Sequence, residues 1–206
     1  MYKLYSIPGT CSTGIVALLK KLGQSVEIIH RDDVPDYAIR INAANQVPIL
    51  DDDGMLIREG AAIVLYLLEK HGSPWLTGDK TEKADFQQWL MFNYATLHSA
   101  YGRIFTVAKI MEEGDAKAQL LQQLADKVSD TWKLLNKRLE TRNFVVGNEA
   151  TIIDYLIVIY SNWNRAFPQL KIILGENVER LVEEVSALSE IQAAYESENI
   201  QSKIAA

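Results

Sequence analysis

The chain has 206 residues, of which 48% are hydrophobic and 23% are charged, and its formal net charge is −6. This composition is typical of a folded protein with enough apolar residues for one large domain or two small ones, and it excludes a largely disordered chain. Lysine and arginine are dispersed along an acidic chain, so the sequence predicts no nucleic-acid partner, which would need a basic stripe.

Two further features concern the compartment and metal binding. No apolar run approaches the length of a membrane span, and residues 1–5 have the pattern of a strand rather than of a signal peptide. We therefore expect a cytoplasmic protein with no membrane partner. The single cysteine, Cys11, excludes an internal disulfide and leaves no CxxC motif or Cys/His set for a metal.

The first forty residues alternate strand and helix signals. We expect strands at 2–7 and 25–30, a helix at 12–22 that Gly23 closes, and a short helix at 36–41. A strand, a helix and a second strand in this order predict one parallel βαβ unit.

A hairpin and a third helix follow. Two short apolar runs, 46–50 and 55–58, flank an acidic turn that ends in Asp53-Gly54, a pair that tolerates positive φ angles. The apolar period becomes helical at Gly60, so the sequence predicts a helix that begins directly after the second strand. The first N–H groups of such a helix have no partner within it and favour a carboxylate.

Pro48 stands at the head of the first hairpin strand, where a proline indicates an edge, a turn or a cis bond. A cis bond would turn the backbone N–H and carbonyl of Val47 toward an extended ligand. The alternative is a trans proline that only begins a strand, with Glu59 as a solvated acid.

Residues 72–79 collect glycines, a proline and polar residues into a linker, and the chain beyond it has helical spacing only. We expect long helices at 81–111 and 115–141, a helix from a capping box at Thr151-Ile152-Ile153-Asp154 to Phe167, and shorter helices at 176–188 and 190–198. The expected domains are an α/β layer at 1–75 and an all-helical domain at 80–206.

Four motifs in this order resemble a known family. They are Pro8-Gly9-Thr10-Cys11-Ser12, Gln46-Val47-Pro48, Glu59-Gly60 and Thr151-Ile152-Ile153-Asp154. Together they are similar to the cytosolic glutathione S-transferases, and the first and third are most similar to the bacterial Beta class. The resemblance covers nearly the whole chain. It implies a thioredoxin-like N-terminal domain, an all-α C-terminal domain, a homodimer, and glutathione as co-substrate without a metal.

Cys11 lies at the mouth of the first predicted helix, where unpaired N–H groups and the helix dipole stabilise an anion. We expect a thiolate that accepts a hydrogen bond from the glutathione sulfur or forms a mixed disulfide with it, a role that the resemblance also implies. A small buried filler is the alternative. Ser12 is the competing donor to a glutathione thiolate, or else only an N-cap.

His98 lies in the first long helix, in register with the Beta-class segment that ends in a catalytic-site histidine. The resemblance therefore implies that His98 hydrogen-bonds the sulfur or shuttles a proton near neutral pH. The alternative is a core histidine bonded to a carbonyl. The catalytic candidates are Cys11, Ser12 and His98, and the residues expected to bind the tripeptide are Gln46, Val47, Pro48, Glu59 and Gly60.

Aromatic residues at helical spacing offer a pocket for the second substrate. Tyr94, Tyr101, Phe105 and Trp163 would together accept a flat, apolar molecule, but aromatic stripes on helices are equally typical of plain core.

Two positions depart from the Beta-class pattern. Ser6 stands where that class has a tyrosine, and the neighbouring Tyr5 is expected to point to the opposite face of the strand. The acidic segment 31–36 has no clear match for the basic residue that the class places near the glycyl carboxylate of glutathione, and Arg31 is a candidate replacement.

The expected function is conjugation of glutathione to apolar electrophiles in detoxification, or glutathione-dependent reduction of a disulfide or peroxide. Both reactions need a stabilised thiolate. The alternative is a non-catalytic scaffold of the same fold that binds a protein partner and whose glutathione pocket is vestigial.

Overall fold

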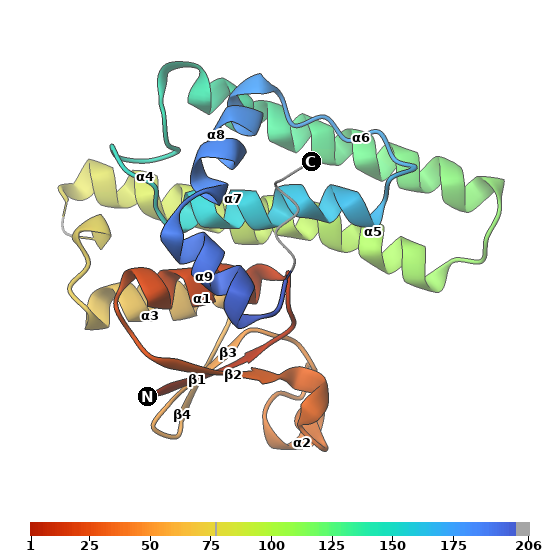
Figure 1. The fold of residues 1–206 in the computed structure, drawn as a ribbon. Helices are drawn as coiled ribbons and strands as arrows, with labels where there is room; N and C mark the ends of the chain where they lie inside the picture. The colour runs from red at the N-terminus through yellow and green to blue at the C-terminus, as the bar shows by residue number, and fades with distance from the viewer. Residues whose placement is uncertain (77, 201–206) are drawn as a thin grey trace. The chain divides into compact units, whose positions relative to one another are not determined.

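The computed structural model describes residues 1–76 and 78–200, with only the backbone at residues 38 and 39. Strands and helices alternate up to residue 70, and the described chain from residue 80 onward is helical (Figure 1). Contacts divide the chain into two compact units: unit 1 comprises residues 1–86 and the segment from Val185 onward, and unit 2 comprises residues 87–184. The expected fold class, a thioredoxin-like α/β layer combined with a helical region, is confirmed.

The sheet of unit 1 has the strand order β2-β1-β3-β4. Its strands are β1 (Tyr2–Ser6), β2 (Val26–His30), β3 (Ile49–Asp52) and β4 (Met55–Arg58). β1 pairs in parallel with β2 and antiparallel with β3, where Leu4 lies opposite Leu50. β3 and β4 form the predicted hairpin, and Asp53 and Gly54 have the positive φ angles, 51° and 94°, that the turn sequence predicts.

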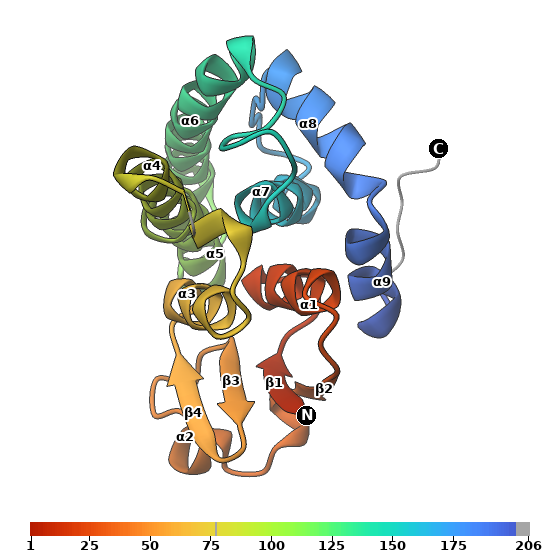
Figure 2. The same cartoon turned by 90° about the vertical axis from the view of Figure 1, so that its left-hand side faces the viewer.

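Two helices of unit 1 cover one face of this sheet. α1 (Cys11–Lys21) and α3 (Gly60–Lys70) lie side by side on that face, and the short α2 (Tyr37–Arg40) lies on the other (Figure 2). The side chains between sheet and helices are fully buried apolar residues such as Leu4, Leu18 and Leu67. Burial of this apolar surface is the main force that holds the layer together.

The last helix of the described chain belongs to unit 1. α9 (Ser189–Ser197) packs along α1, so contacts do not group residues 185–200 with the helical segment that we expected at 80–206. Its buried residues Ile191 and Ala194 explain this, because they give the helix one apolar face. Residues 201–206 of the expected domain lie outside the described chain, and the domain division itself stays a prediction.

Unit 2 is built from helices. They are α4 (Lys80–Met91), which enters it from unit 1, then α5 (His98–Ile110), α6 (Asp115–Arg138), α7 (Ile152–Asn162) and α8 (Glu176–Ser186). The residues of α7 from Ile152 to Ser161 are all buried, which makes this helix the centre of the unit. The predicted capping box at its start is confirmed, with Thr151 as N-cap and Asp154 as the acidic partner.

Two predicted helices differ from the expectation, because one is interrupted and the other ends early. The helix expected at 81–111 is interrupted by a π-helical stretch at Phe92–Leu97, where the buried Asn93 donates from its side-chain amide to the carbonyl of Trp89, 3.1 Å away. A side chain that bonds the backbone in this way is a usual cause of irregular turns. The helix expected to reach Phe167 ends at Asn162, and a 3₁₀ turn, Trp163–Ala166, follows.

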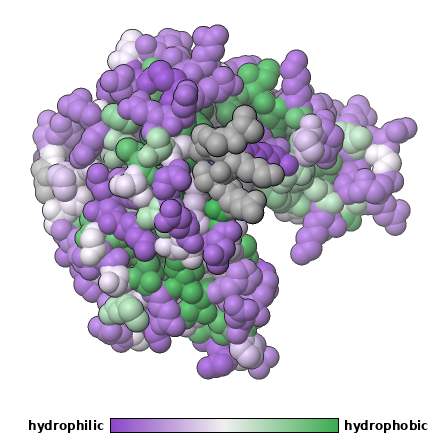
Figure 3. Space-filling view, viewed as in Figure 1, coloured by the Kyte–Doolittle hydropathy of each residue, from purple (hydrophilic) through white to green (hydrophobic). Residues whose placement is uncertain are grey.

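The surface in Figure 3 is mainly hydrophilic, with scattered apolar areas. Large apolar side chains that remain more than a third exposed include Met55, Phe105 and Ile110. Among the described helices, none combines the length and the apolar character that crossing a membrane requires.

Candidate functional site

The loop after β1 connects this strand to α1. The helix begins at Cys11, one residue before the expected start, and its N-cap is Thr10, whose hydroxyl accepts a hydrogen bond from the N–H of Ser12. The alternative in which Ser12 is the N-cap is therefore wrong. Gly9 has a φ of 76°, a conformation that glycine adopts without a steric penalty.

The hydroxyl of Ser12 is fully buried in a polar network. Its oxygen lies 2.7 Å from the hydroxyl oxygen of Ser6 and 2.7 Å from that of Thr10, and it donates to the carbonyl of Ile7 at 3.1 Å. In the described structure, the hydrogen bonds of the Ser12 hydroxyl therefore all go to other residues of unit 1. Its role as donor to a glutathione thiolate stays a prediction, and it would require these bonds to exchange.

Glu198 completes this network, and the sequence did not indicate it. Its carboxylate is 7% exposed and accepts hydrogen bonds from Ser6 at 2.6 Å and Thr13 at 2.5 Å. Burial raises its pKa, and the hydrogen bonds that it accepts oppose that shift. The only signal in the sequence was the pair of hydroxyl residues, Ser12 and Thr13, at a helix start, and no local spacing connects them to an acid some 190 residues away.

Cys11 is buried, with 4% of its side chain exposed. Burial raises the pKa of its thiol to about 12, although the N–H groups of Cys11 and Ser12 lower it, and the carboxylate of Glu59 raises it further. The lowered pKa that we expected at this helix start is therefore wrong for the described structure. The helix N–H groups lower the pKa of the thiol, as expected, but the free-energy cost of removing a thiolate from water is larger.

The segment before β3 carries the expected backbone geometry. The bond between Val47 and Pro48 is cis, so of the alternatives that the sequence left open the trans proline is wrong. The carbonyl of Gln46 accepts hydrogen bonds from the Tyr37 hydroxyl and the Asn42 amide, at 3.0 and 3.1 Å. In contrast, the backbone N–H and carbonyl of Val47 bond to no described residue.

Glu59 and Gly60 lie where β4 passes into α3. Glu59 is exposed and has a φ of 67° and a ψ of 116°, an unusual conformation for a residue with a side chain. The first intrahelical bond runs from the N–H of Ile63 to the carbonyl of Glu59, so the N–H groups of residues 60–62 have no partner among the described residues. The effect of Glu59 on the Cys11 thiol places both residues in one region of unit 1.

Arg31, the candidate for the missing basic contact, is already engaged. Its guanidinium pairs with Asp32 at 2.8 Å and donates to the carbonyl of Asn45 at 3.3 Å. Tyr5 points to the face opposite Ser6, as expected, because its ring packs against Tyr37 at 5.7 Å between centroids. Among residues 1–76 and 78–200, no three His, Cys, Asp or Glu side chains gather as a metal-binding group.

The remaining predicted site residues lie in unit 2. His98 contacts the rings of Tyr160 and Trp163, at 5.6 and 5.3 Å between centroids, and burial lowers its pKa, so the imidazole is neutral at pH 7. Because Cys11 belongs to unit 1, the expected meeting of the two residues stays a prediction.

The four aromatic residues of the expected pocket have different surroundings. Tyr101 is fully buried, and its hydroxyl bonds to Asn164 at 2.5 Å and to the Trp132 indole at 2.9 Å, so it is a core residue. Phe105 is 39% exposed and packs against Trp163. Tyr94 is partly buried. The second-substrate role of this set stays a prediction.

Comparison with known proteins adds to this geometry. Residues 1–69 match the family described as the glutathione S-transferase N-terminal domain. Glutathione S-transferase D7 of Drosophila melanogaster is 28% identical over an alignment of 222 positions, gaps included, that covers 95% of this chain and 96% of that protein. The chain is thus similar to the glutathione S-transferases, through a family match over residues 1–69 and relatives that span nearly its whole length.

Solved structures of glutathione S-transferases share the fold of this chain. The glutathione S-transferase from Xylella fastidiosa is 20% identical with a TM-score of 0.85, and the match covers 97% of this chain and 100% of that one. The structure of Ure2p in complex with glutathione is 21% identical with a TM-score of 0.78, over 94% and 97% of the two chains. At these identities the likeness concerns the fold alone.

Proposed function

We propose that this protein is a glutathione transferase of Beta-like type that binds glutathione in unit 1, at the start of α3. The observation that carries the proposal is the backbone of Glu59, which holds a positive φ directly before the unpaired N–H groups of that helix. Unusual backbone angles cost free energy and cluster at sites that clamp ligands. A helix start with free N–H groups is a ready seat for a carboxylate.

Each unpaired backbone group and the exposed carboxylate of this region have a matching partner on the tripeptide. Its γ-glutamyl carboxylate would accept from the N–H groups of Gly60 and Ala61, and its ammonium would pair with the exposed carboxylate of Glu59. Its cysteinyl backbone would pair with the open N–H and carbonyl of Val47, as an added strand does. Pro48 begins the strand behind this contact, and the exposed Gln46 borders it.

The chemistry that this geometry favours is conjugation. Because burial raises the pKa of Cys11 to about 12, its thiol stays protonated at pH 7 and donates a hydrogen bond instead of becoming a nucleophile. Glutathione would lose its own thiol proton to water, and its thiolate sulfur would form the bond to an electrophilic carbon while the leaving group departs with the electron pair of the bond that breaks. Lowering a thiol pKa from about 8.5 to neutrality needs only about 2 kcal/mol of anion stabilisation.

Reduction through a mixed disulfide at Cys11 is the rival chemistry, and it predicts a different fate for this cysteine. We expect that Cys11 in the native protein reacts with iodoacetamide at pH 7.5 on the order of 10³-fold more slowly than a free cysteine, because so little thiolate is present. We also expect no glutathione adduct after treatment with oxidised glutathione, with intact-mass spectrometry as the measurement. Unfolded protein is the control, and rapid formation of the adduct in native protein would establish the redox alternative.

The proposed contact between the Glu59 carboxylate and the ammonium of glutathione provides a test of the binding site. Glu59→Gln should weaken glutathione binding by roughly 10-fold to 100-fold in isothermal titration calorimetry, since it removes one charge-assisted pair. The same substitution should leave the affinity for a glutathione analogue without the α-amino group unchanged. Glu69→Gln, which changes an exposed acid at the other end of α3, is the matched control.

A non-catalytic scaffold that binds a protein partner is the second candidate function. It is favoured by the engagement of Arg31 with Asp32, which leaves no free cation from segment 31–36 for the glycyl carboxylate of glutathione. Wild-type protein that fails to bind millimolar glutathione in calorimetry would favour the scaffold and remove the transferase proposal. The homodimer, the cytoplasmic location and the detoxifying role stay predictions.

A further inference from the structure

The backbone carbonyl of Gln46 is held by two side chains from earlier in the chain. The Tyr37 hydroxyl donates to it at 3.0 Å, and the side-chain amide of Asn42 donates to it at 3.1 Å. Two donors on one carbonyl occupy both of its lone pairs. The carbonyl therefore has one fixed direction, although Gln46 itself is exposed and lies in neither a helix nor a strand.

The same peptide unit carries the N–H of Val47. The bond between Gln46 and Val47 is trans, in contrast to the cis bond that follows it. In a planar trans peptide the carbonyl and the N–H point in opposite directions. The two bonds to the carbonyl therefore aim the Val47 N–H away from Tyr37 and Asn42, and this N–H bonds to no described residue. A carbonyl that accepts hydrogen bonds also polarises its peptide unit, which makes the N–H a better donor.

Both donors are themselves held in place. Tyr37 is buried in a cluster with Tyr5, whose ring meets it edge to face, and the side chain of Val47 packs against this cluster. The side-chain oxygen of Asn42 accepts from the N–H of Ala44 at 3.2 Å, which directs its amide nitrogen to the other side. Burial raises the pKa of Tyr37 to about 12, so its hydroxyl keeps its proton and stays a donor around neutral pH.

We propose that Tyr37 and Asn42 are positioning residues for glutathione, because they hold the Val47 N–H in the direction in which it donates to the cysteinyl carbonyl of the tripeptide. This inference rests on the proposed binding of glutathione in unit 1. Neither side chain touches the tripeptide, and both act through the peptide unit between Gln46 and Val47. A role in packing alone would need the ring of Tyr37 but not its hydroxyl, and this difference can be measured.

The test removes the two donors and keeps the ring. In isothermal titration calorimetry of the full chain, the double variant Tyr37→Phe/Asn42→Ala should weaken glutathione binding by roughly tenfold, the size of one lost hydrogen bond. Tyr37→Phe alone should weaken it by roughly threefold, because Asn42 still holds the same carbonyl. A glutathione analogue with a methylene in place of the cysteinyl carbonyl has nothing to accept from Val47. Its affinity should therefore be the same in wild type and in both variants.

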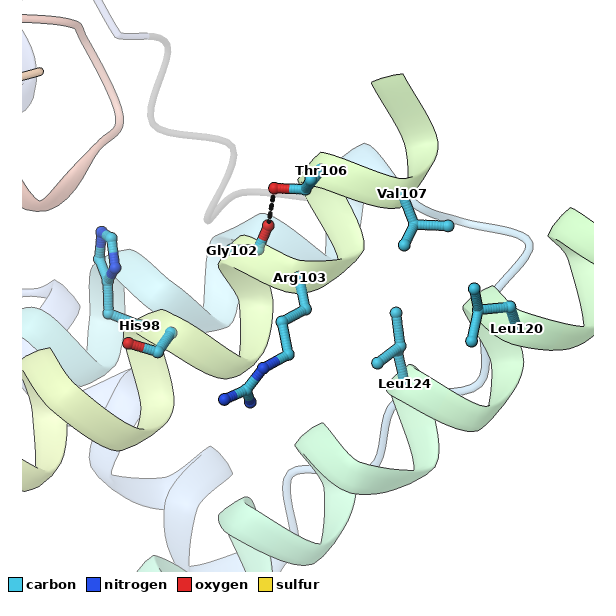
Figure 4. A pocket seen from close by; sticks show the side chains of 8 residues that line it. His98, Gly102, Arg103, Thr106, Val107, Leu120 and Leu124 are labelled. Atoms are coloured by element: carbon cyan, nitrogen blue, oxygen red, sulfur yellow. Dashed lines mark hydrogen bonds between the residues drawn. The ribbon is translucent and has the colours of Figure 1, made fainter. Parts of the chain in front are cut away.

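Two matched variants serve as controls for the loss of a hydroxyl. Tyr5→Phe removes the hydroxyl of the neighbouring ring in the same cluster. Thr106→Val removes a hydroxyl that donates to the carbonyl of Gly102 at 2.8 Å within α5 of unit 2 (Figure 4). Both variants should bind glutathione as wild type does.

The outcomes separate this inference from the proposed function. Equal glutathione affinity in the double variant and in wild type would overturn the inference and leave the proposed function standing. An equal loss of affinity for the analogue would overturn it too, since the two residues would then only stabilise the segment in general. Wild-type protein that does not bind glutathione would remove the proposed function, and the inference with it.

Discussion

Replacing Asp154 with alanine is expected to lower the free energy of unfolding by about 3 to 5 kcal/mol. The carboxylate of Asp154 is fully buried and accepts three hydrogen bonds: from the N–H of Val145 at 3.0 Å, and from the N–H and hydroxyl of Thr151 at 2.8 and 3.1 Å. Alanine would leave two buried N–H groups without a partner at the start of α7. Each such group costs about 1 to 3 kcal/mol.

Because of the position of Asp154, we expect its loss to destabilise the whole of unit 2. α7 is buried along its length, so its first turn and the segment that contains Val145 must form together for the core to pack. Denaturant unfolding followed by circular dichroism measures the effect. Asp126→Ala is the control, because Asp126 is an exposed acid on α6, and its removal should change stability by less than about 0.5 kcal/mol. An Asp154→Ala variant as stable as Asp126→Ala would contradict the prediction.

The same residue predicts a pH dependence. Burial raises the pKa of Asp154 from 3.8 to about 6, and the hydrogen bonds that its carboxylate accepts only partly oppose this shift. The folded protein therefore binds the proton more tightly than the unfolded chain does, so this group stabilises the fold fully below pH 4, and the contribution disappears as the pH rises through 6. The stability difference between wild type and Asp154→Asn should shrink between pH 4 and pH 7, by up to about 3 kcal/mol.

The fold follows from the sequence where signals are local. The Asp53-Gly54 turn, the start of α3 at Gly60 and the capping box of α7 each depend on a few adjacent residues, and the structure has all three. The break of the long helix at Phe92–Leu97 was not predictable from periodicity, because Asn93 fits a helix pattern until its burial decides which partner its amide takes. The place of α9 in unit 1 depends on packing that sequence spacing does not report.

The candidate site divides in the same way. The cis bond at Val47-Pro48 was one of the forms that the proline indicated, and it is present. The positive φ of Glu59 was not indicated by the sequence, because glutamate rarely adopts that conformation. The protonation state of Cys11 was not predictable, because the sequence places this residue at a helix start but does not say how much solvent reaches it. The helix N–H groups lower the pKa of its thiol, and burial outweighs them. Charge effects depend on the surroundings, so a motif alone does not fix their sign.

The second large effect is expected at Glu198, which connects the end of the described chain to the end of β1 and the first turn of α1. Glu198→Ala should lower the free energy of unfolding by about 2 to 4 kcal/mol, because the buried hydroxyls of Ser6 and Thr13 lose a charged acceptor. Glu198→Gln should cost less, since its amide oxygen still accepts one of these bonds. Glu196→Ala, at an exposed acid on α9, is the control in the same unfolding measurement.

The loss of Glu198 should also change the chemistry of Cys11. Glu198 holds the hydroxyls of Ser6 and Thr13, which lie on either side of the Cys11 position in the chain, and Ser6 in turn bonds to Ser12. Without this anchor the start of α1 opens more often, and water reaches the thiol, so its pKa falls toward the ordinary value. Alkylation of Cys11 by iodoacetamide at pH 7.5 should then be faster in Glu198→Ala than in Glu196→Ala, by on the order of tenfold or more. Equal alkylation rates in the two variants would mean that the burial of Cys11 does not depend on this carboxylate.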